Sequence, residues 1–253
     1  REPHALRTHP WLGPSLYDAQ PLHDPRHFID YTQSGVRSNF HRPENVGQRA
    51  ARWLESARQF WMARQLNPPQ GTTPEILAYL NAVHDVANAL SSLKGPPLPP
   101  RRVGWALFET TAELDIPHLY PDFIALLGGE HADPDQMSSW LEDWEHTVDA
   151  IHGPPEPHRI HALNKTYYLQ ALKSMLHSDR PTSPLWTLLK TWAEGVLAQP
   201  EGQRDSSAWQ SACQTLGLWG DPFQERLSEF DAFLDQADQA VRSLTNVEDV
   251  DLL

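Results

Sequence analysis

Cysteine is nearly missing from this chain, since Cys213 is the only one in 253 residues. A single cysteine cannot form an intrachain disulfide, which is typical of a reducing compartment. No apolar run approaches the roughly 18 residues that a membrane-spanning helix needs, and no stretch resembles a secretory signal peptide. We therefore expect a cytoplasmic protein that makes no membrane contact.

Basic residues are also scarce. The chain has 20 Lys and Arg against 33 Asp and Glu, a formal net charge of −13. Nucleic-acid binding needs clustered cations, so this class of partner is unlikely on composition. The charge is uneven: residues 1–66 hold nine arginines and six acids, a local +3 that leaves −16 for residues 67–253. The basic part could face an anionic ligand or the acidic remainder of the chain.

The common catalytic and metal-binding signatures are missing as well. There is no HExxH and no Cys/His finger spacing, no Gly-rich phosphate loop and no GxSxG turn. Asp249 and Asp251 form an Asp-x-Asp pair, but the preceding QAVRSLTNVE predicts a helix end instead of the Gly-Ser turn and strand that nucleotidyltransferases place before that pair. We predict no catalytic residue, metal site or cofactor within this chain.

Helical periodicity is what the sequence has in abundance. Apolar residues such as Val46, Ala50, Trp53 and Leu54 recur at spacings of three and four, and proline-rich breaks separate such segments. The class is therefore all-α, a multi-helix bundle of about eight to ten helices. The predicted helices span about 25–39, 43–65, Thr73 to the KGPPLPP break, 101–114, 117–127, 133–151, 156–177, 183–198, 205–217 and 221–244.

Two segments suggest how the chain is divided. Residues 1–24 are rich in proline, and we predict an irregular junction segment there, with SLYDAQPL as a candidate short strand. HGPPEPH is the best candidate for an internal boundary. It separates a first helical bundle at 25–152 from a second helical half at 153–253, and the two halves could also form one continuous domain.

The stretch NAVHDVANAL at 81–90 places polar side chains on an otherwise apolar helix, which we expect to lie centrally in the bundle. At about 100° per residue, Asn81, Asp85 and Asn88 fall within about 60° of one another, with His84 beside them. Buried polar groups need hydrogen-bond partners. Two interpretations stay open: an internal network that fixes helix register, or a pocket wall where Asp85 meets a cationic or hydroxyl-bearing ligand.

Glu55 and Arg58 add a second candidate pair on the helix predicted at 43–65. Their i, i+3 spacing is typical of a surface ion pair, which stabilises a protein little. If this helix borders a site, Glu55 could instead serve as a general base. Together with the polar stripe, the pair completes the residues that we predict to contact a substrate: Asn81, His84, Asp85, Asn88, Glu55 and Arg58.

One region resembles a known family. Within about 16–66 the chain reads LYDAQPLHDPRHFIDYTQSGVRSNFHRPENVGQRAARWLESARQFW. It resembles the junction of bacterial nucleotidyltransferase-like proteins of the aminoglycoside-nucleotidyltransferase type, where a phrase like LYDP leads from a catalytic α/β domain into an Arg-containing bundle helix. NAVHDVANALSSLKGPPLPPRR is similar to their second bundle helix and the turn after it, and HLYPDFIALLGG to the next short helix. The resemblance covers about residues 16–150.

The resemblance implies a C-terminal helical domain that recognises a substrate beside a catalytic domain. Nucleotide and Mg²⁺ would bind only in such an upstream domain, because the Gly-Ser and Asp-x-Asp pattern is missing here. The chain alone should therefore not transfer a nucleotide. The acceptor would be a small cationic or hydroxylated molecule drawn to an acidic cleft, with Asp85 or Glu55 as a carboxylate base.

Two other function classes stay open. A stand-alone helical protein-protein interaction module would suit the ten tryptophans and the acidic helices, and a large exposed apolar patch would favour it. An RNA-binding or RNA-cleaving helical bundle of the kind paired with nucleotidyltransferases carries an Arg and a His four to six residues apart on one helix. Arg37 and His41 have this spacing, but Pro43 follows closely and the acidic charge opposes RNA.

Overall fold

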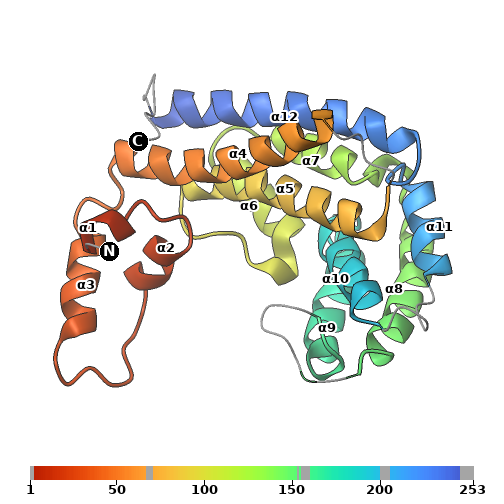
Figure 1. Ribbon diagram of the computed structural model, residues 1–253, viewed down its shortest axis with the longest axis horizontal. Helices are drawn as coiled ribbons and strands as arrows, with labels where there is room; N and C mark the ends of the chain where they lie inside the picture. Colours follow the sequence, from red (N-terminus) through yellow and green to blue (C-terminus); the bar gives the residue numbers. More distant parts are fainter. Residues whose placement is uncertain (1–2, 67–70, 153, 155–159, 200–205, 246–253) are drawn as a thin grey trace.

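The computed structural model describes residues 3–66, 71–152, 154, 160–199 and 206–245, and within these ranges the protein is helical without any strand (Figure 1). The predicted all-α class is confirmed. No helix in this part of the chain is long and apolar enough to cross a membrane. The helices are α1 (Pro3–Leu6), α2 (Leu12–Tyr17), α3 (Phe28–Arg37), α4 (Pro43–Leu66), α5 (Thr73–Ser92), η1 (Pro100–Arg102), α6 (Val103–Glu113), α7 (Leu119–Leu126), η2 (Gly129–His131), α8 (Pro134–Asp149), η3 (Ala162–Asn164), α9 (Lys165–Leu176), α10 (Leu185–Ala198), α11 (Ser207–Thr215) and α12 (Pro222–Thr245).

Helix ends follow local capping chemistry. Thr72 and Glu75 form a reciprocal capping box at the start of α5, and the Asp133 side chain accepts a hydrogen bond from Gln136 N at the start of α8. Asp24 caps α3, since its carboxylate accepts from the amides of residues 28–30. This helix begins three residues later than predicted, because His27 adopts a left-handed φ of 53° just before it.

The N-terminal segment differs from the prediction. We expected an irregular segment with a possible strand in residues 1–24, but α1 and α2 form there. Tertiary contacts explain the difference: Gln33 Nε2 of α3 donates to the carbonyl oxygens of Leu16, Tyr17 and Ala19 at the end of α2. Because these partners lie about 15 residues apart in sequence, no local pattern reveals them. We call residues 5–42 the N-terminal lobe, which protrudes at one end of the fold (Figure 1).

The core centres on α5, as its apolar composition predicts. Helix α5 packs against α4, α10 and α12, and α4, α5 and α12 run side by side along one edge of the molecule (Figure 1). The buried Tyr79 ring contacts Phe223 and Phe230 of α12, and its hydroxyl donates to Leu126 O. One apolar cluster extends from α4 to α12. Helices before and after the HGPPEPH segment, most of which lies outside the described residues, share this core.

A glycine allows α6 to approach the turn before α10. A Cβ at Gly104 would lie 2.3 Å from Ser183 O, so Gly104→Ala should force the two segments apart and lower the free energy of unfolding by about 1–3 kcal/mol. Urea denaturation measures this loss. The matched control is Gly95→Ala, where an added Cβ meets nothing within 4 Å. Equal stability of the two variants would contradict the close packing.

Candidate binding surface

Part of the predicted polar stripe faces the protein interior. His84 and Asn88 are buried, and the His84 ring stacks on Trp186 of α10 with centroids 4.4 Å apart. Asn88 Oδ1 accepts a hydrogen bond from Leu98 N at 2.8 Å, and its Nδ2 lies 3.4 Å from His84 Nε2. These two side chains therefore tie α5 to α10 and to the proline-rich loop, as the network interpretation predicts for them.

The other two members of the stripe lie closer to solvent. Asn81 is exposed, whereas Asp85 is half-buried and accepts a hydrogen bond from Ser56 Oγ of α4 at 2.7 Å. Burial raises the pKa of Asp85 from 3.8 to about 6, and the Ser56 hydrogen bond opposes this shift only in part. Asp85 is thus a carboxyl group with an unusually high proton affinity at the α4–α5 seam.

Glu55 and Arg58 do not pair with each other. Glu55 accepts from Gln59 Nε2 at 2.8 Å on the same helix. Arg58 instead reaches α12, where its Nη2 lies 3.6 Å from Asp235 Oδ1 and 3.9 Å from Asp238 Oδ2. The six predicted substrate contacts therefore do not share one site. His84 and Asn88 lie in an interior network, Asp85 at the α4–α5 seam and Arg58 at the α4–α12 seam, whereas Glu55 bonds within α4 and Asn81 is exposed.

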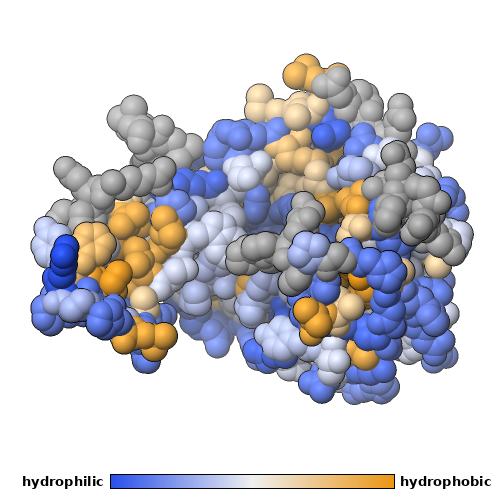
Figure 2. All heavy atoms as spheres, turned by 60° about the horizontal axis from the view of Figure 1, so that its bottom comes forward, coloured by the Kyte–Doolittle hydropathy of each residue, from blue (hydrophilic) through white to orange (hydrophobic). Residues whose placement is uncertain are grey.

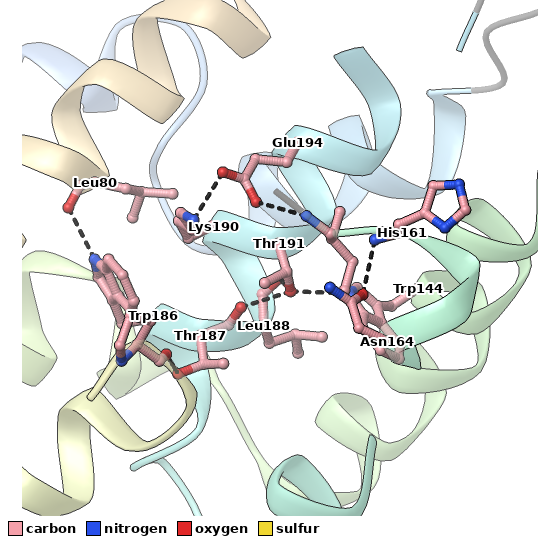
Figure 3. A network of polar contacts seen from close by, with 12 residues as sticks. Leu80, Trp144, His161, Asn164, Trp186, Thr187, Leu188, Lys190, Thr191 and Glu194 are labelled. Atoms are coloured by element: carbon pink, nitrogen blue, oxygen red, sulfur yellow. Dashed lines mark hydrogen bonds and ion pairs between the residues drawn. The ribbon is translucent and has the colours of Figure 1, made fainter. Parts of the chain in front are cut away.

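A larger polar network, which sequence reasoning missed, surrounds α10 (Figure 3). Trp144 Nε1 of α8 donates to Thr191 Oγ1, which in turn donates to the carbonyl of Thr187. Trp186 Nε1 donates to Leu80 O of α5, on the opposite side of the helix. Each buried group here has a protein partner, so the network reads as structural. Its only sequence signal is the i, i+4 threonine pair in an apolar helix.

A buried ion pair completes the same region. Lys190 Nζ lies 2.7 Å from Glu194 Oε1, and both side chains are at least 86% buried. Glu194 also accepts from Ile160 N at 3.4 Å, just before η3 (Figure 3). The pair therefore fastens α10 to the segment that leads into α9. The positive charge of Lys190 also acts on His84 of α5. Burial lowers the pKa of His84 to about 3, and repulsion from Lys190 contributes to this shift.

The N-terminal lobe exposes an apolar surface. Figure 2 shows hydrophobic atoms gathered on this lobe, at the left of the view. Among the described residues ten large hydrophobic side chains are exposed, and half of them lie here: Trp11, Leu12, Leu22, Phe28 and Tyr31. Phe28 and Tyr31, one helical turn apart on α3, are 67% and 68% exposed. We call these five residues the apolar face.

A hollow adjoins this face. Its walls are Trp11, Pro14, Ser15, Asp18 and Ala19 of the lobe and the Pro96–Pro100 segment opposite, and its volume is about 320 Å³. The far wall is held in place, since Ser91 Oγ donates to Pro96 O and the Leu98 amide donates to Asn88. The hollow is thus a largely apolar, open depression with one carboxylate and a proline wall that hydrogen bonds hold in place. No sequence pattern predicts that residues 11–19 and 96–100 lie together.

Metal ligands are not gathered in the described ranges, where no group of three or more His, Cys, Asp or Glu could hold an ion. Comparisons with known proteins add no identity: no family model matches the chain, and neither the curated proteins nor the solved structures contain a similar one. The nucleotidyltransferase-like resemblance therefore remains a prediction.

Proposed function

We propose that the protein is a protein-interaction module that binds a partner on the apolar face of its N-terminal lobe. The exposure of five large apolar side chains on one small lobe carries the proposal, because contiguous apolar patches on soluble proteins are most often interaction sites. Trp and Tyr are also favoured at interfaces, where they bury much area and keep a polar atom at the edge.

The hollow supplies a place for an anchoring side chain. Its Trp11 ring already rests edge-on against Trp53 of α4, with centroids 5.0 Å apart, so one side of that ring is fixed while the side chain remains 46% exposed. A preformed pocket costs little ordering free energy on binding. We expect the partner to insert one large apolar side chain between Trp11 and the Pro96–Pro100 wall.

Charge indicates the chemistry around that anchor. The lobe, residues 5–42, holds four Arg against three Asp, a formal +1 in an acidic chain, and Arg26 is exposed two residues before Phe28. A second copy presenting the same face would meet like charge. A partner segment with an apolar anchor and acidic flanks fits better, because complementary charge speeds encounter and favours the correct register.

The family resemblance suggests one such partner. Leu22, Phe28 and Tyr31 lie within residues 16–66, which resemble the junction between the catalytic and helical domains of nucleotidyltransferase-like proteins. A catalytic domain of that type on the apolar face would make this chain its substrate-recognition half. The RNA-cleaving alternative finds less support: Arg37 is the last residue of α3, and His41 lies beyond it with Nε2 3.1 Å from Tyr17 Oη.

Replacing Phe28 and Tyr31 with serine should abolish partner binding without unfolding the protein, since both side chains are exposed. Each variant, with a photo-crosslinker placed at Leu22, would be incubated with lysate of the source organism, and crosslinked proteins identified by mass spectrometry. Wild type should give one dominant crosslinked product, and the yield of this product should be at least tenfold lower for the double variant. Leu163→Ser, which removes an exposed leucine outside the lobe, is the matched control. A product that survives in the double variant, or none in wild type, would overturn the proposal.

A further inference from the structure

A second pocket lies beyond the proline-rich loop and shares no lining residue with the hollow. One wall is formed by η1 and the first turn of α6. The other wall is formed by α9 and by Ser178, which follows that helix. Its volume is about 370 Å³, within the range of small-molecule sites. The lining residues are Arg101, Arg102, Trp105, Gln170, Ala171, Ser174, Met175 and Ser178. We call it the arginine pocket.

Like Arg26, Arg37 and Arg52, the two arginines have no carboxylate partner among the described residues, in a chain with 33 acids and 20 cations. Other arginines, such as Arg58, Arg64 and Arg226, do have such pairs. Two arginines without a carboxylate partner among the described residues therefore line one pocket.

Arg101 is also held in position. Its guanidinium carbon lies 4.0 Å from the centroid of the Tyr167 ring, a stacking contact that fixes the plane of the group and leaves its edge donors available. Arg102 is exposed beside it. A planar guanidinium that is already ordered loses less entropy when it binds an oxyanion, so the pair is prepared for a bidentate contact.

The remaining walls add neutral donors and an aromatic surface. Gln170 and Ser174 are exposed on α9 and contribute an amide and a hydroxyl. Trp105 is half-buried, and its Nε1 donates to Glu109, so the indole orientation is set while part of the ring lines the pocket. The first turn of α6 carries no acidic side chain to oppose an anion.

We infer that the arginine pocket binds a small molecule that carries a phosphoryl group on a planar apolar body. The phosphoryl oxygens lie against Arg101 and Arg102, whose fork of donors matches phosphate geometry. The planar body lies against Trp105. A carboxylate ligand would offer two oxygens instead of three and a smaller charge, and is bound more weakly. This site is independent of the apolar face.

The test is isothermal titration of the full chain with phenyl phosphate, inorganic phosphate and benzoate. Phenyl phosphate should bind most tightly, inorganic phosphate more weakly because it lacks the planar body, and benzoate weakest. Arg102→Ala should weaken phenyl phosphate roughly tenfold or more. Arg52→Ala, which removes an exposed arginine of α4, is the control and should change nothing.

A second variant, Arg101→Ala, tests the other arginine of the pocket by circular dichroism and titration. Arg101→Ala could disturb Tyr167, so circular dichroism of that variant accompanies its titration, and Arg102→Ala decides the result if Arg101→Ala unfolds. Benzoate binding as tight as phenyl phosphate would overturn the phosphoryl assignment. Phenyl phosphate binding that is unaffected by Arg102→Ala, or no heat from wild type at millimolar ligand, would overturn the site.

Discussion

Arg49→Leu should lower the free energy of unfolding by about 2–4 kcal/mol, because it removes two hydrogen bonds between α4 and the N-terminal lobe. Arg49 is 1% exposed, and its Nη1 donates to Arg7 O at 2.8 Å and to Phe40 O at 3.0 Å. Its guanidinium carbon also lies 3.8 Å from the Phe40 ring centroid. Burial lowers its pKa to about 10, so the group stays charged near neutral pH.

The loss should be concentrated in the lobe. Leucine cannot donate to either carbonyl group, and the buried Phe40 carbonyl then lacks this donor. We expect urea denaturation to show the lower stability and limited proteolysis to cut first within residues 5–42. Arg52→Leu, one turn along the exposed side of α4, should change stability by less than about 0.5 kcal/mol. A stable Arg49→Leu protein with an uncut lobe would show that apolar packing alone positions the apolar face.

Asp85→Asn and His84→Gln should change the pH dependence of stability in opposite directions. Burial, assisted by the Lys190 charge, lowers the pKa of His84 from 6.5 to about 3. Burial raises the pKa of Asp85 from 3.8 to about 6. Adjacent residues on α5 thus have proton affinities shifted in opposite senses relative to the unfolded chain.

The signs follow from proton binding. Between about pH 6.5 and 3 the unfolded chain protonates His84 before the folded protein does, so the His84 contribution to stability is lost as the pH falls. Between about pH 6 and 4 the folded protein protonates Asp85 first, so stability rises as the pH falls. Each slope is about 1.4 kcal/mol per pH unit, and the two contributions oppose each other between pH 6 and 4.

Each variant should therefore expose the other residue's contribution. Relative to wild type, Asp85→Asn should be more stable by about 1–3 kcal/mol at pH 7 and should lose this advantage towards pH 4. The amide can still accept the Ser56 hydrogen bond. His84→Gln should be less stable at pH 7 and should approach wild type as the pH falls. Urea denaturation at half-unit intervals, read as differences from wild type, cancels the other titrating groups. Differences that are constant with pH would contradict both burial arguments.

A gain in stability from Asp85→Asn would also bear on function. Binding sites often contain groups that lower stability, so a destabilising carboxylate at this position is compatible with a role in binding. Such a result would favour the predicted contact between Asp85 and a cationic ligand. The Asp85 side chain is half-buried at the α4–α5 seam and already accepts a hydrogen bond from Ser56. No gain would support a purely structural role.

The sequence by itself determined most of the helices from α3 to α12 and the central place of α5. Periodic apolar residues, caps such as Asp24, Thr72 and Asp133, and proline-rich breaks act over a few residues, so their effect can be read locally. They also identified His84 and Asn88 as polar groups in need of partners. These local signals do not identify the partners. Trp186 lies about 100 residues further along the chain, and the position of Leu98 depends on the path of the proline-rich loop.

Only the tertiary structure decided which surfaces are available for binding. Gln33 of α3 supports the helix at residues 12–17 through hydrogen bonds to its C-terminal carbonyl groups. Arg58 lies near aspartates of α12. The hollow forms only because residues 11–19 lie opposite residues 96–100. The arginine pocket likewise joins the η1 turn to α9. Each of these features is a contact between segments far apart in the chain, whose formation depends on how whole helices pack, and no local pattern encodes that.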